Sequence, residues 1–142
     1  MKLPFILLHI LFIQHFMNQD PLSITIKNIK HPSAKVFVAV ATKTPKFPDD
    51  QKIVKGFEID PKGLKEIRVT INDLPYGEYA ITTFQDIDGD KKLSTNFLGA
   101  PKEPFGFSNN FKPRFKGPQW SDCSFQYNSK SNKQEISLIK LF

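Results

Sequence analysis

Residues 66–84 read EIRVTINDLPYGEYAITTF, and this stretch decides the fold. Ile67, Val69 and Ile71 alternate with polar residues, which is the period of a β-strand with one buried face. Leu74 to Gly77 then turn the chain, and a second strand opens at Tyr79. In many β-sandwiches a tyrosine so placed packs its ring inside and bonds its hydroxyl to nearby backbone. We therefore predict a structural role for Tyr79.

The same strand pattern recurs along most of the chain. In LSITIKNI, Leu22, Ile24 and Ile26 share one face, whereas KVFVAVAT is apolar on both faces and predicts a central strand. A shorter strand is expected around Ile53 and Phe57, and no helix of convincing period follows the N-terminal stretch. Further strands are expected in YAITTF (79–84), CSFQY (123–127) and EISLIKLF (135–142). About seven short strands separated by turns predict an all-β fold, an antiparallel β-sandwich with one long irregular loop.

One long segment breaks this regularity, from Gln85 to about Trp120. It contains four prolines and several phenylalanines, among them Phe105 and Phe107. Loops of this length are uncommon without a function or a clamp. Because the aromatic side chains supply apolar contacts, we expect the segment to pack over one end of the sandwich.

The N-terminus has the pattern of a secretory signal peptide. Lys2 precedes an apolar run from Leu3 to Met17, which is shorter than the about 20 residues that span a bilayer. We expect residues 1–19 to be removed near Asp20, with residues 20–142 forming a single β-sandwich domain. A buried N-terminal strand or helix is the alternative, since His9 and His15 interrupt the run and no small-residue cleavage pattern precedes Asp20. The expected location is periplasmic or extracellular, with no transmembrane segment in the mature chain.

Charge and cysteine content narrow the class of protein further. The net charge is +6, but the lysines are scattered rather than gathered in a stripe, so we expect no nucleic-acid partner. We expect a monomer whose partner, if it has one, is an envelope polysaccharide or protein. Cys123 is the single cysteine and cannot form an internal disulfide, so we expect it to pack as a small buried residue.

The stretch QDIDGDKKLSTNFLG (85–99) carries aspartates at every second position, Asp86, Asp88 and Asp90. Alternating carboxylates in a tight turn can converge on a calcium ion, which takes six to eight oxygens. It is not an EF-hand, because Lys91 and Phe97 stand where that loop needs glycine and glutamate. The predicted calcium ligands are Asp86, Asp88, Asp90, Ser94 and Asn96. The alternative is an exposed turn whose aspartates are partly neutralised by Lys91 and Lys92.

No catalytic motif accompanies this cluster. The chain contains no G-x-S-x-G, H-E-x-x-H, Walker A or dinucleotide-binding pattern, so we expect no enzyme and assign no catalytic residue. The alternative in a different class is a small hydrolase, or a hydrolase accessory domain, that uses Asp86, Asp88 and Asp90.

The stretch 74–110, LPYGEYAITTFQDIDGDKKLSTNFLGAPKEPFGFSNN, resembles a bacterial family of exported proteins known as domain of unknown function 2141. The resemblance rests on the acidic loop after a G-x-Y-A strand, on a Leu-Gly-x-Pro turn and on the run GFSNN (106–110). It implies a sandwich of prealbumin or immunoglobulin type and an envelope location, with no established activity. The chain departs from the family pattern at Gln85, Lys91 and Ser94, where the family tends to have histidine, glycine and aspartate.

The segment around GFSNN allows two interpretations. Ser108, Asn109 and Asn110 can bond backbone and cap turns while Phe107 fills the end of the sandwich, which is the interpretation we favour. Alternatively, loop aromatics and amides form a site for a glycan or a peptide. The candidate ligand-binding residues of that site are Trp120, Phe105, Asn109 and Asn110.

Overall fold

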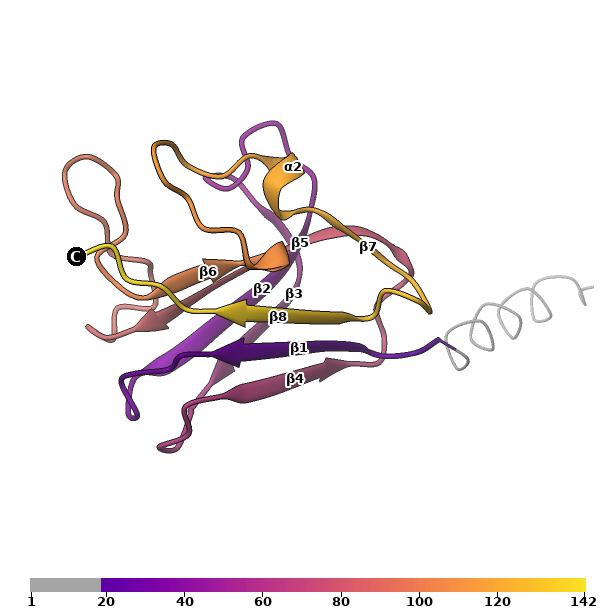
Figure 1. Ribbon diagram of the computed structural model, residues 1–142, viewed down its shortest axis with the longest axis horizontal. Helices are drawn as coiled ribbons and strands as arrows, with labels where there is room; N and C mark the ends of the chain where they lie inside the picture. The colour runs from indigo at the N-terminus through magenta and orange to yellow at the C-terminus, as the bar shows by residue number, and fades with distance from the viewer. Residues whose placement is uncertain (1–18) are drawn as a thin grey trace, which may run out of the picture.

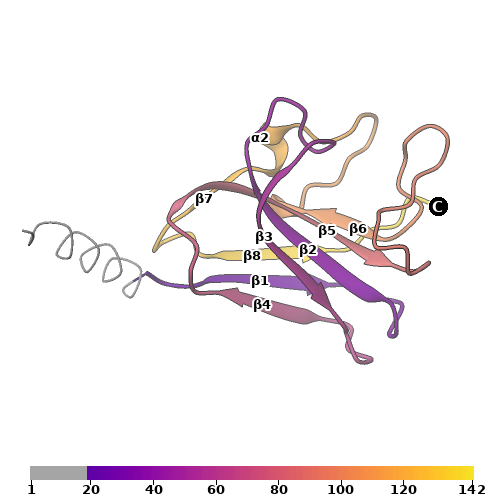
Figure 2. The ribbon, with the colours of Figure 1, turned by 180° about the vertical axis from the view of Figure 1, so that it is seen from behind.

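A computed structural model describes residues 19–142, so the predicted signal peptide lies almost wholly outside the described residues. The chain forms two facing β-sheets (Figures 1 and 2), which confirms the predicted all-β sandwich. One sheet has the order β4-β1-β8, and the other has the order β3-β2-β5-β6 with β7 beside the far end of β5. Among residues 19–142, no helix is long and apolar enough to cross a membrane.

Each predicted strand forms, with some changes of length. The strands are β1 (Leu22–Lys27), β2 (Lys35–Thr42), β3 (Lys52–Ile59), β4 (Ile67–Ile71), β5 (Gly77–Asp86), β6 (Phe105–Phe107), β7 (Phe125–Tyr127) and β8 (Lys133–Ser137). The strand β6 and two short helical turns, η1 (Ser108–Asn110) and α2 (Trp120–Cys123), lie in the segment expected to be irregular and were not predicted. The last strand is shorter than predicted, because the chain leaves the sheet after Ser137 and Ile139 instead bridges Phe105.

The core lies between the two sheets and follows the predicted alternation. Ile24 on β1, Val38 on β2 and Ile81 on β5 are fully or almost fully buried. β2 lies between β3 and β5, which confirms its assignment as a central strand. On the outer face of the same sheet Phe37 and Phe84 stack with ring centroids 5.1 Å apart.

The turn before β5 is built as predicted. The Tyr79 hydroxyl donates to the carbonyl oxygen of Pro75 at 2.8 Å, and its ring is buried. Burial raises the pKa of the Tyr79 hydroxyl above its ordinary value. The predicted structural role of Tyr79 is therefore confirmed.

One strand pair differs from the antiparallel prediction. β1 pairs with β4 antiparallel but with β8 in parallel, with Ile24 opposite Gln134 and Ile26 opposite Ile136. Parallel pairing needs a long crossover rather than a hairpin, and here the rest of the domain separates the two strands in sequence. Alternation within one strand does not encode the direction of its neighbour, so the pattern could not reveal this.

The two sheets approach closely where β6 passes β8. A Cβ atom placed on Gly106 would lie 2.6 Å from Cγ2 of Ile136, closer than real side chains come. The GFSNN run therefore begins with a glycine because a neighbouring side chain occupies the space that any other residue would need.

Candidate metal centre and the long loop

The acidic loop starts where β5 ends at Asp86 and returns to the sheet at β6. The backbone N–H of Gln85 donates to the Pro104 carbonyl at 2.8 Å, which closes the base of the loop. Within it, Asp86, Asp88 and Glu103 each offer one carboxylate oxygen, and these atoms all lie within 4.8 Å of one another. Asp86 and Glu103 are buried, at 5% and 4% exposure, whereas Asp88 is exposed.

Glu103 is the member of this cluster that the sequence did not reveal. One of its oxygens accepts the N–H groups of Ile87 (2.7 Å) and Asp88 (3.3 Å), and the other accepts the N–H of Ser94 (3.0 Å). Glu103 thus ties the end of the loop to its beginning. The sequence offered only a weak signal for it: Glu103 is the one acidic residue between Lys91 and Pro118, but it lies far along the chain from Asp86 and Asp88.

Asp86 shapes the turn that follows β5. Its two carboxylate oxygens accept the N–H groups of Gly89 (2.9 Å) and Lys91 (3.0 Å). Both of those residues have positive φ, 77° and 63°, in the left-handed region that glycine adopts readily and lysine rarely. The hydrogen bonds to Asp86 hold the backbone in that conformation.

Asp88 completes the cluster from the exposed side. One oxygen accepts the Ser94 hydroxyl at 2.5 Å, and the other accepts the Asp90 N–H at 3.1 Å. The Ser94 hydroxyl, followed by the Asp90 N–H, lowers the pKa of the Asp88 carboxyl below its ordinary value. Asp88 is therefore charged at neutral pH.

The structure places the other predicted calcium ligands differently. Ser94 touches the cluster through Asp88, whereas Asp90 and Asn96 lie outside the group of three carboxylates. Asp90 accepts the N–H of Lys92 at 2.8 Å, and Asn96 accepts those of Leu98 and Ala100. Two of the three predicted aspartates thus converge, and Glu103 takes the place of the third.

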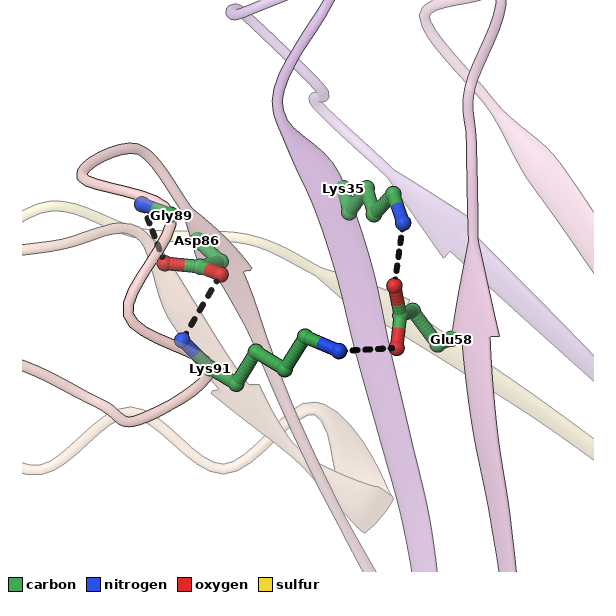
Figure 3. A network of polar contacts seen from close by, with 5 residues as sticks. All are labelled: Lys35, Glu58, Asp86, Gly89 and Lys91. Atoms are coloured by element: carbon green, nitrogen blue, oxygen red, sulfur yellow. Dashed lines mark hydrogen bonds and ion pairs between the residues drawn. The ribbon is translucent and has the colours of Figure 1, made fainter.

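A hollow of about 390 Å³ lies beside the cluster. Its wall includes His31, Lys35 and Glu58 as well as Asp86, Asp88 and Lys91. Glu58 pairs with Lys35 and, at 3.8 Å, with the ammonium group of Lys91, which reaches across β2 (Figure 3). The hydrogen bond from Lys35 lowers the pKa of Glu58.

This ion-pair network directs the Lys91 charge away from the aspartates. Lys91 donates its backbone N–H to Asp86, but its side chain pairs with Glu58 (Figure 3). Among residues 19–142, no ion pair involves Asp86, Asp88 or Glu103. The cluster consists of carboxylate oxygens with one hydroxyl beside them, which is the donor set of a hard cation such as calcium.

The candidate glycan- or peptide-binding residues make their contacts within the fold. Phe105 is buried, and Trp120 donates its indole N–H to Glu78 at 2.7 Å while its ring packs edge-on against Phe47. Asn109 donates its side-chain amide to the carbonyls of Asp122 and Ser124, and Asn110 accepts the N–H of Ser137. These contacts agree with the structural interpretation of the GFSNN run, and ligand binding there stays a prediction.

Cys123 lies at the end of α2 and is fully buried, as predicted. Burial raises the pKa of its thiol to about 12. The thiol therefore stays protonated at neutral pH and is not an activated nucleophile.

A β-sandwich with an acidic loop between two strands is the class that this geometry defines. Residues 24–135 match the model of a bacterial family described as "Uncharacterized protein conserved in bacteria (DUF2141)". The match spans most of the chain, so the protein belongs to this family. Comparisons with curated proteins and with solved structures gave no match.

Proposed function

We propose that the protein is an exported, non-enzymatic binding or structural module of the bacterial envelope, whose acidic loop is ordered by a calcium ion. The observation that carries the proposal is the convergence of Asp86, Asp88 and Glu103, with ligand atoms within 4.8 Å of one another. The signal-like N-terminus supports export, and the family is described as bacterial.

The electrostatics of the cluster favour a bound cation. Three carboxylates at this separation repel one another, and burial of Asp86 and Glu103 weakens the screening by water. No lysine or arginine of residues 19–142 pairs with them, and Lys91 is turned toward Glu58. The backbone N–H groups relieve part of the repulsion, and a divalent cation would relieve the rest.

The residues present fit calcium better than zinc. The cluster offers carboxylate oxygens and the Ser94 hydroxyl, without histidine or cysteine. Calcium binds through oxygens in a flexible geometry and accepts water in its remaining positions, whereas zinc sites are rich in nitrogen and sulfur. Calcium would order the loop by joining its beginning at Asp86 to its end at Glu103.

Thermal unfolding with and without calcium tests the proposal. Calcium should raise the melting temperature, because a ligand at a hundredfold excess over its dissociation constant stabilises by about 2.7 kcal/mol. Asp88→Ala and Glu103→Gln should abolish the shift. Asp90→Asn is the matched control and should keep it, since Asp90 lies outside the cluster. Absence of any shift in melting temperature at millimolar calcium would refute calcium binding.

Export is tested separately. The protein recovered from cell fractions should lie outside the cytoplasm and begin near Asp20. Recovery of the intact N-terminus in the cytoplasm would contradict the envelope role without bearing on calcium.

One observation favours the alternative hydrolase class. The hollow beside the cluster is lined by His31 together with Asp86 and Asp88, groups that can transfer protons. Turnover of a glycan, ester or peptide substrate that disappears in Asp86→Asn would replace the binding role with this one.

A further inference from the structure

Two loops of the long segment carry highly exposed apolar side chains. Phe97 and Leu98 are 95% and 77% exposed at the tip of the acidic loop. Phe115 is 101% exposed in the loop between η1 and α2. Single exposed apolar residues are ordinary, but exposed apolar residues that gather on one face mark interaction sites.

The tips are held in place by the surrounding structure. Asn96 accepts the N–H groups of Leu98 and Ala100, and Gly99 turns the chain with φ of 80°. In the second loop Phe111 packs against the cluster around Phe107, and Pro118 is buried. Phe97 and Phe115 thus project from anchored loops.

Both loops rise on the same side of the molecule. Figures 1 and 2 show them at the top, on the side away from β4. A flat partner that approaches from that side can meet both tips together.

The charge around these tips is strongly positive. Residues 91–118 contain six lysines and arginines but one acid, Glu103, which is buried. Lys112, Arg114 and Lys116 flank Phe115, and Lys92 and Lys102 flank Phe97 and Leu98 in sequence; all five are exposed. Among residues 19–142, none of these five forms an ion pair.

We propose that this surface, the tips Phe97-Leu98 and Phe115 with their flanking basic residues, docks on an anionic lipid bilayer. Aromatic side chains favour the depth of the lipid headgroups, and basic residues near the surface are attracted to anionic lipids. A bilayer is flat, negatively charged and apolar just below its surface, so it complements both parts of the surface. A folded protein partner would have to offer acidic patches around two separate apolar pockets.

This inference goes beyond the proposed function, and calcium binding is not required for it. The experiment uses a chain that begins at Gln19, which contains every described strand, so that the apolar run of residues 3–17 does not itself bind lipid. Sedimentation with vesicles is measured in EDTA and in calcium. Binding in both would keep the docking surface separate from the metal centre.

Vesicles of mixed phosphatidylglycerol and phosphatidylcholine should bind the protein, and vesicles of phosphatidylcholine alone should bind it much less. The variant Phe97→Ser/Leu98→Ser/Phe115→Ser should bind the mixed vesicles at least about tenfold more weakly, because full burial of one such side chain already contributes that factor. Leu64→Ser is the matched control, since Leu64 is 59% exposed in the turn before β4, at the bottom of Figure 1. It should bind as the unmodified chain does.

The charge is tested by Lys112→Glu/Lys116→Glu, which should bind the mixed vesicles at least about tenfold more weakly, since each basic residue near an anionic surface contributes about fivefold and two are lost. The control Lys62→Glu/Lys65→Glu reverses the same amount of charge in the turn before β4 and should have a much smaller effect. Equal binding to both kinds of vesicle, or no binding to either, would overturn the proposal. If the charge variant lost binding while the triple serine variant bound fully, the apolar tips would not insert into the bilayer, and that part of the proposal would be overturned.

Discussion

The three-stranded sheet and the acidic loop are ordered by different interactions. In β1, Leu22, Ile24 and Ile26 are fully buried against the facing sheet. In the acidic loop the apolar residues Phe97 and Leu98 point into solvent. The loop is held instead by side-chain oxygens that accept backbone N–H groups, from Asp86, Asp88, Asp90, Asn96 and Glu103.

The two regions therefore differ in how they respond to ions and to acid. An apolar core is insensitive to ions and acid until it unfolds as a whole. A loop ordered by carboxylates responds to cations and protons at constant fold. Cations and protons can therefore change local order in the loop while the sheets stay folded. Three predictions test this difference between the loop and the sheets.

The largest effect is expected in the sandwich. Ile24→Ala removes a fully buried side chain and should cost about 2–5 kcal/mol of unfolding free energy, from lost burial and the cavity left behind. Ile53→Ala is the control: Ile53 is 56% exposed, and the change should stay within about 0.5 kcal/mol. Urea unfolding measures both. Equal losses in the two variants would mean that the core is not where the buried residues place it.

A smaller and more local effect is expected at Glu103. Glu103→Ala leaves the N–H groups of Ile87, Asp88 and Ser94 without their acceptor, and an unsatisfied buried group costs about 1–3 kcal/mol. In EDTA, amide exchange should accelerate at Ile87 and Ser94 and stay unchanged at Ile24. Asp90→Ala should leave Ile87 and Ser94 protected. Acceleration throughout β1 would show that the loop and the sheet unfold as one unit.

The smallest effect is expected from acid. Hydrogen bonds hold the pKa of Asp88 below the ordinary 3.8, so its contribution to stability is fully present above the unfolded-state pKa and is lost as the pH falls through the folded-state pKa. The amide signals of Asp90 and Ser94 should therefore be constant from neutral pH down to about 4 and move below that. In Asp88→Asn the movement of the Asp90 amide should be reduced, because the group that accepts its N–H no longer changes charge. A transition near pH 6 would contradict the assigned pKa direction.

The sheet architecture was predictable because alternation reports burial directly. In β4 the predicted inward residues Ile67, Val69 and Ile71 are buried and the residues between them are exposed. The central position of β2 was predictable in the same way, because its sequence is apolar on both faces. Pairing direction was not predictable, since the parallel pair of β1 and β8 depends on the path of the whole chain.

The candidate site was predictable only in its first half. Asp86 and Asp88 are two residues apart, and local spacing brings their carboxylates together. Glu103 arrives from the far end of the loop, and its position depends on β6 pairing with β5. The spacing argument also placed Asp90 in the cluster, whereas its carboxylate turns to the N–H of Lys92.

The pairing of β1 with β8 has a consequence for folding during synthesis. The first strand of the domain lies between β4, near the middle of the chain, and β8, which ends at Ser137. Until β8 has left the ribosome, one edge of β1 has no neighbour and Ile136 is missing from the interior. A growing chain therefore cannot complete this domain from the N-terminus onward, and the sandwich closes only once β8 has emerged.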